Sequence, residues 1–81
     1  MITIREFLNR IKWDKSLNPD DYKIYYYDNK LNKIIEIDFK QIKEIDTNFM
    51  VIERDSKETD IPLHIITEVR RKGKLVWSRG K

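Results

Sequence analysis

Two similar stretches of the sequence, IDFKQIKEI at residues 37–45 and IPLHIITEV at residues 61–69, lie 24 residues apart. Their apolar residues coincide at four positions, and Glu44 matches Glu68. Each stretch is typical of a strand end, then a tight single turn that places a bulky side chain in the core, then a new strand at a changed angle. Two such corners let a sheet bend back on itself, as in small barrels and sandwiches.

The start of the chain predicts a short helix over residues 4–12. Thr3 followed three positions later by Glu6 is a capping-box pattern. One face of this helix is expected in the core, because apolar residues recur there at helical spacing: Ile4, Phe7, Leu8 and Ile11. We expect the helix to end near Trp13 and Asp14, and residues 15–21 to form a loop.

Beyond this loop the apolar period changes from 3.6 to 2, which is typical of strands. In addition to the two corners, strands are expected at residues 22–28, 34–38, 49–53, 66–72 and 75–78. The predicted fold class is α+β, with one N-terminal helix packed on a strongly curved antiparallel sheet, or a small partly open barrel, of five to six short strands. Residues 1–81 are too few for two cores and are taken as a single domain.

Composition excludes several kinds of chemistry. The chain has no cysteine, so it has neither a disulfide framework nor a thiolate metal site. Its only glycines are Gly73 and Gly80, so no glycine loop for a cofactor phosphate is expected. The acidic residues of the loop at 14–21 are interpreted as caps and turn formers, and no metal site is expected. The absence of a leader pattern or a long apolar run predicts a cytoplasmic protein outside the membrane.

Charge is distributed unevenly along the sequence. The net charge is +3, but residues 70–81 contain six basic side chains and no acidic one. We therefore predict that the C-terminal hairpin, residues 66–81, is a basic surface that attracts a polyanion such as RNA. The alternative is a solvated hairpin whose charges only increase solubility.

The candidates for chemistry are one histidine and a few aromatic residues. Because acid–base work on phosphoesters needs a second titrating group or a metal, His64 alone predicts a protein that is not an enzyme. His64 either donates to a phosphate or bonds to nearby backbone. Trp13 is expected to plug the core, with base stacking as the alternative. Trp77 is weighed between a core position and stacking of a base beside basic residues.

Four motifs together resemble a known family: LNRIKWD at residues 8–14, Asp21-Tyr22, IPLHII at 61–66 and GKLVWSR at 73–79. They are similar to the small, mainly archaeal RNA cyclic group end recognition domain. The resemblance implies binding of RNA ends with a 2′,3′-cyclic or related terminal phosphate, and a role beside RNA-repair proteins. The recurrent polar residues of that family fall on Asn9, Arg10, Lys12, Trp13, Asp14 and His64. Ile65 stands where the family commonly has arginine, and residues 58–60 lack its usual glycine.

The resulting hypothesis is an RNA-binding module. Arg10 and Lys12 hold a terminal phosphate, His64 donates a hydrogen bond to it, and a tryptophan or tyrosine stacks the last base. The expected RNA-binding residues are Asn9, Arg10, Lys12, Trp13, Asp14, His64, Arg70, Arg71, Trp77 and Arg79. Two alternatives stay open: a protein-interaction adaptor that docks through the basic hairpin, and a phosphoesterase that uses His64.

Overall fold

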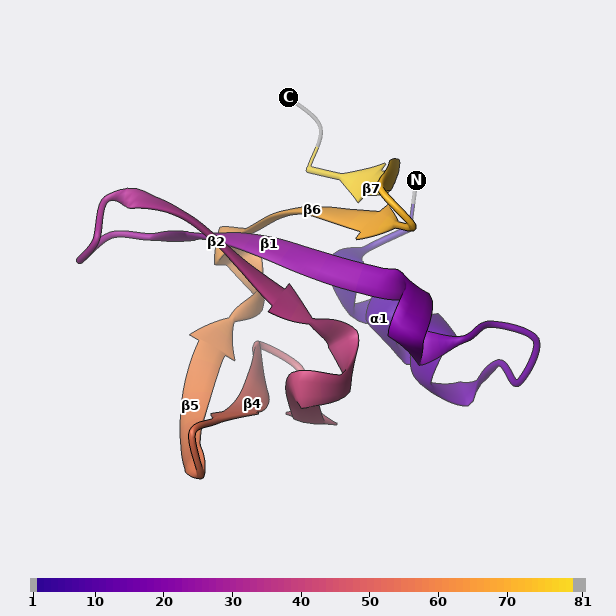
Figure 1. Ribbon diagram of the computed structural model, residues 1–81, viewed down its shortest axis with the longest axis horizontal. Coiled ribbons are helices and arrows are strands. Elements are labelled where there is room, and N and C mark those ends of the chain that lie inside the picture. Colours follow the sequence, from indigo (N-terminus) through magenta and orange to yellow (C-terminus); the bar gives the residue numbers. More distant parts are fainter. Residues whose placement is uncertain (1, 80–81) are drawn as a thin grey trace.

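The computed structural model describes residues 2–79 and, within them, contains one α-helix, three short 3-10 helices and seven strands (Figure 1). In chain order the elements are α1 (Ile4–Trp13), η1 (Pro19–Asp21), β1 (Tyr22–Asp28), β2 (Lys33–Asp38), η2 (Phe39–Gln41), β3 (Ile42–Ile45), β4 (Phe49–Arg54), β5 (Lys57–Pro62), η3 (Leu63–Ile65), β6 (Ile66–Arg71) and β7 (Lys74–Ser78). No helix in this part of the chain is long and apolar enough to cross a membrane. Positions 80 and 81 of the predicted basic hairpin lie outside the described residues.

The strands form two antiparallel sheets that do not close into a barrel. One has the order β2-β1-β6-β7 and the other the order β3-β4-β5. The α+β class is confirmed, but the expected five to six strands were too few. On one side of each corner the chain forms a complete strand, β3 after η2 and β5 before η3, and both pair with β4 in a second sheet.

Both corners predicted from the repeated stretches are present. In each, a 3-10 turn buries one bulky side chain, Phe39 in η2 and Leu63 in η3. The corner η2 carries the chain from β2 to β3, and η3 carries it from β5 back to β6. As a result, β6 pairs with β1 and extends the hairpin β1–β2 in one sheet. In the other sheet, β3 pairs with β4 and extends the hairpin β4–β5. Phe39 and Leu63, the side chains buried at the two corners, therefore belong to the same core.

Helix α1 begins as the capping box predicts. The Thr3 hydroxyl accepts the Glu6 backbone N–H at 3.1 Å, and the Glu6 carboxylate accepts the Thr3 N–H at 3.1 Å. The helix buries Ile4, Leu8 and Ile11 against a core to which both sheets contribute. Figure 1 shows α1 beside the first half of β1. The capping and the apolar face together fix where the N-terminal end of the helix lies.

The two tryptophans have opposite environments. Trp13 is 73% exposed, so its predicted core position is wrong. Position 13 is two residues past the buried Ile11, and residues two apart on a helix point to opposite sides. Trp77 is only 8% exposed, and its indole N–H donates to the Ile2 carbonyl at 3.1 Å. The stacking role considered for Trp77 is therefore corrected to a core role, because its ring faces are covered.

Candidate functional site

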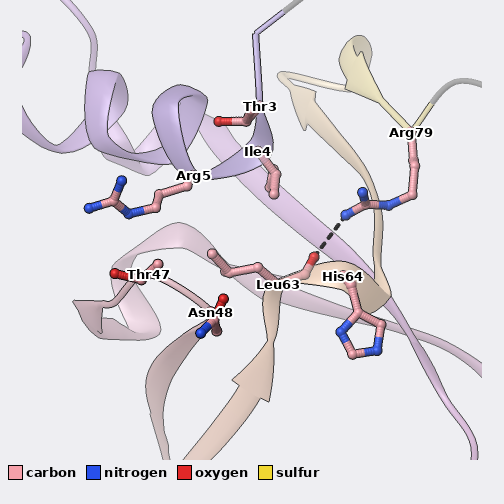
Figure 2. A pocket seen from close by; sticks show the side chains of 8 residues that line it. All are labelled: Thr3, Ile4, Arg5, Thr47, Asn48, Leu63, His64 and Arg79. Atoms are coloured by element: carbon pink, nitrogen blue, oxygen red, sulfur yellow. Dashed lines mark hydrogen bonds between the residues drawn. The ribbon is translucent and has the colours of Figure 1, made fainter.

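Four segments far apart in the sequence surround an open cleft of about 550 Å³ (Figure 2). They are the start of α1, the turn between β3 and β4, the corner η3, and the residue after β7. The cleft is lined by Thr3, Ile4, Arg5, Thr47, Asn48, Leu63, His64 and Arg79. Within residues 2–79 this lining includes two arginines and a histidine but no carboxylate. Its chemistry therefore favours an anionic ligand.

Arg79 is held against the corner by its own side chain. Its Nη2 donates to the Leu63 carbonyl at 2.8 Å, and its Nε donates to the Ile66 carbonyl at 3.1 Å. The Arg79 backbone N–H also donates to the Thr67 carbonyl at 3.0 Å, and the guanidinium lies 5.4 Å from the centre of the Trp77 ring. Two of the five guanidinium N–H groups are used in these bonds. The remaining N–H groups can bind a ligand, and the position of the guanidinium is already set.

His64 occupies the middle of η3 and is exposed at the cleft. The corner beneath it is fixed because Leu63 is buried and the Leu63 N–H donates to the Asn48 carbonyl at 3.0 Å. Among residues 2–79 the imidazole makes no hydrogen bond, so the alternative of a histidine bonded to nearby backbone is not observed. The ring is therefore positioned by the corner and available to a ligand.

Helix α1 does not bring the predicted phosphate ligands together. Arg10 and Lys12 are two positions apart and point to opposite sides of the helix, so they cannot jointly hold one phosphate. Arg5 shares a flank with Asn9 and Lys12, at spacings of four and seven, and of these helical residues only Arg5 lines the cleft. In Figure 2 the Arg5 side chain extends away from Arg79. Arg5 thus belongs both to the cleft lining and to the side of α1 that carries Asn9 and Lys12.

The C-terminal end of α1 forms a separate exposed surface. The Lys12 ammonium lies 5.4 Å from the centre of the exposed Trp13 ring. Asp14 caps the helix and accepts the Ser16 hydroxyl at 2.6 Å and the Ser16 N–H at 2.9 Å. These hydrogen bonds, assisted by the charge of Arg10, lower the pKa of Asp14. Asp14 is therefore a turn former, while Lys12 and Trp13 offer a charge and an aromatic face about 12 Å along the helix from Arg5.

The basic hairpin is less positive in the structure than in the sequence. Arg70 pairs with Glu68, and the Arg70 guanidinium lies 5.8 Å from the centre of the Tyr25 ring. Asp21 lies 4.0 Å from the Arg71 guanidinium and 3.9 Å from the Lys72 ammonium. Acidic residues from outside positions 70–81 thus offset part of the charge that the sequence concentrates there. Among hairpin residues 66–79, which the structure describes, Arg79 alone lines the cleft.

Of the eight lining residues, sequence reasoning predicted only His64 and Arg79 as site residues. Thr3, Ile4 and Leu63 were expected only in the helix cap and the core, and no role was predicted for Arg5, Thr47 and Asn48. Arg5 could have been found from its helical spacing to Asn9 and Lys12. No local signal marks Thr47 and Asn48, because their turn reaches the cleft only through sheet pairing and the bond between Asn48 and Leu63.

For acid–base chemistry, the described residues of the cleft supply one imidazole, that of His64. No group of three or more potential metal ligands is found among residues 2–79, and no carboxylate lines the cleft beside His64. The arrangement is suited to holding an anion through charge-assisted hydrogen bonds.

Comparison with known proteins agrees with the resemblance seen in the motifs. The family model of the MJ1316 RNA cyclic group end recognition domain matches residues 1–79. A UPF0248 protein of Metallosphaera sedula is 33% identical over 78 residues, which cover 96% of this chain and 94% of that protein. A UPF0248 protein of Saccharolobus solfataricus is 36% identical over 81 residues, which cover 95% of this chain and 96% of that protein. No solved structure matches this chain significantly.

The family description names recognition of an RNA end and names no reaction. The matched residues include α1, both corners and Arg79, which lines the cleft. This chain belongs to the MJ1316 RNA cyclic group end recognition domain family.

Proposed function

We propose that this protein binds RNA at a 3′ end that carries a 2′,3′-cyclic or terminal phosphate, and that the cleft at η3 is the binding site. The observation that carries the proposal is the lining of the cleft, which gathers Arg5, His64 and Arg79 with no carboxylate from the described part of the chain. The description of the family as an RNA cyclic group end recognition domain supports the same ligand.

Arg79 and His64 are the groups proposed to hold the terminal phosphate. A guanidinium fits two phosphate oxygens with parallel hydrogen bonds, and an imidazole N–H can donate a third. Asn48, on the opposite wall of the cleft, offers a side-chain amide to the same ligand. This assignment replaces the grip by Arg10 and Lys12 that the sequence suggested.

Arg79 also bears on position 65, where this chain has isoleucine and the family commonly has arginine. Its bonds to the carbonyls of Leu63 and Ile66 hold a guanidinium at the corner η3, where the family commonly has an arginine directly after the histidine. A guanidinium is thus present at this corner although position 65 is isoleucine.

Fluorescence anisotropy on one short RNA tests the proposal. The RNA carries a 2′,3′-cyclic phosphate, a 3′-phosphate or a 3′-hydroxyl, and each form is titrated with the full chain at two salt concentrations. We expect a preference of tenfold or more, about 1.4 kcal/mol, for a phosphorylated end. We also expect His64→Ala to reduce this preference while binding of the hydroxyl end is kept.

Two results would overturn end recognition. Equal and steeply salt-dependent binding of all three RNAs would make the protein a general RNA binder. Absence of binding would instead favour the docking alternative, for which the edge strand β7 exposes Leu75 and Val76. Light scattering and a pull-down would then be the next measurements.

A further inference from the structure

A second hollow of about 440 Å³ shares two of its lining residues with the cleft. His64 and Arg79 line both, so the two depressions adjoin at the corner η3. The other residues that line the second hollow are Tyr27, Ile65, Ile66 and Thr67. Its lining thus combines an aromatic ring with branched aliphatic groups, whereas the first cleft has arginine, amide and hydroxyl groups.

Both depressions are of the size of small-ligand sites, which typically measure about 300–1,000 Å³.

The walls of the second hollow are held in place. The Tyr27 hydroxyl bonds to the Asn32 side chain, which restrains the ring on the surface of β1. Ile65 is half-buried and packs against the core, and the neighbouring Ile66 is fully buried. The Thr67 hydroxyl donates to the Tyr25 carbonyl at 3.2 Å. An apolar ligand would therefore meet a preformed surface.

We infer that the second hollow holds the nucleobase of the terminal nucleotide whose phosphate lies in the cleft. The inference rests on the proposed function and adds a base-binding subsite to it. In a nucleoside 2′,3′-cyclic phosphate the phosphate and the base are attached to different carbons of one ribose. A single nucleotide can therefore span both depressions, with its anionic part in the cleft and its base in the second hollow.

The chemistry of each side matches the part of the nucleotide assigned to it. A base has two apolar π-faces, which pack well on Tyr27 and Ile65. A phosphate needs donors, which the cleft supplies. Ile65 contributes an apolar surface to the second hollow. In this inference, the isoleucine at position 65, where the family commonly has arginine, packs against the base.

Titrations followed by NMR test the inference on the full chain. The probes are adenosine 2′,3′-cyclic phosphate and 1-O-methylribose 2′,3′-cyclic phosphate, which has the same anion and sugar but no base. We expect the adenosine compound to bind about tenfold more tightly. The backbone amides of Tyr27 and Thr67 should shift only with the adenosine compound, whereas those of Asn48 and His64 should shift with both.

Two matched variants test whether the difference in affinity between the probes arises at Tyr27. Tyr27→Leu keeps an apolar side chain but removes the ring, and should abolish most of the tenfold difference between the probes. Tyr25→Leu is the control, because Tyr25 lies on the same strand and lines neither depression. The wild-type amide shifts test the inference independently if a variant fails to fold.

The outcomes separate this inference from the proposed function. Equal affinity for both probes, with shifts confined to the phosphate cleft, would overturn the base subsite and leave phosphate recognition standing. Binding of neither probe would overturn both. Tighter binding of the adenosine compound that survives Tyr27→Leu, without shifts at Thr67, would place the base elsewhere and contradict the inference.

Discussion

The Nη2 atom of Arg79 lies 2.8 Å from the carbonyl oxygen of Leu63, the residue that begins the corner bearing His64 (Figure 2). This contact joins residues 16 positions apart. Arg79 therefore both stabilises the corner and lines the cleft. Stability and ligand binding should therefore be coupled at this position, even under a substitution that keeps the charge.

Arg79→Lys is expected to weaken the corner and the phosphate site together. A lysine keeps the positive charge but cannot donate to the carbonyls of Leu63 and Ile66 and to a ligand at the same time. The free energy of unfolding should fall by about 1–2 kcal/mol, as measured by urea denaturation. The preference for a phosphorylated RNA end should fall as well. An unchanged preference would remove Arg79 from the proposed site. Arg71→Lys, outside the cleft, serves as the control.

Arg5→Ala and Arg10→Ala form a matched pair on one helix. Both remove an exposed arginine, but only Arg5 lines the cleft. Arg5→Ala should weaken binding of an RNA with a cyclic-phosphate end, because it removes a nearby positive charge. Arg10→Ala should have the smaller effect. Anisotropy with both variants at the same salt concentration decides between them. A larger loss for Arg10→Ala would support the original sequence hypothesis instead.

Trp13→Ala should change RNA binding without changing stability. The side chain is 73% exposed, so the free energy of unfolding should change by less than about 0.5 kcal/mol. Loss of a stacking face should weaken binding of an oligonucleotide of several residues by about tenfold. Binding of a mononucleotide cyclic phosphate should be unaffected, because Trp13 lies about 12 Å along α1 from Arg5.

The matched control for this prediction is Leu31→Ala, which removes another exposed apolar side chain, in the segment between β1 and β2. Equal affinities of Trp13→Ala and the wild type for the longer RNA would exclude Trp13 from the interface.

Ser16→Ala should raise the pKa of Asp14 toward its usual value of 3.8, because both the side-chain O–H donor and the local turn that presents the N–H are affected. A carboxyl whose pKa is lowered by folding stabilises the native state above its unfolded pKa, and this contribution is lost as pH falls through the folded pKa. The variant should therefore be less stable than the wild type near neutral pH, and the difference should shrink below the folded pKa.

An NMR titration of the Asp14 carboxyl and denaturation at two pH values check this prediction. Ser78→Ala, at the end of β7, is the control. A stability difference that is the same at both pH values would show that the Ser16 bonds do not act through the charge of Asp14.

The features that could be predicted from the sequence are those encoded by residues close to one another. The capping box at Thr3, the apolar face of α1 and the two corners all depend on spacings of a few residues. The helix and the strands expected outside the corners were found to within about one residue of their predicted ends. Such signals act through local backbone hydrogen bonds and side-chain periodicity, which do not require the rest of the chain.

The errors arose where distant segments meet. The number of strands was too low because the corners divide the strands between two sheets. The charge of the hairpin was overestimated because Asp21 and Glu68 lie beside its arginines. The role of Trp13 was misjudged because its helical spacing from Ile11 points it away from the core, and no other described segment covers that side of α1.

By itself, the sequence determined the fold class, the positions of its helix and corners, and the family to which the chain is similar. The tertiary structure alone decided the site. Strand pairing and core packing bring residues 3–5, 47–48, 63–64 and 79 around one cleft. The physical reason is that local patterns specify elements, whereas the burial of apolar faces from both sheets and the helix specifies how those elements are placed. Arg79, rather than Arg10, reaches the corner that bears His64 because the pairing of β6 with β7 carries it there.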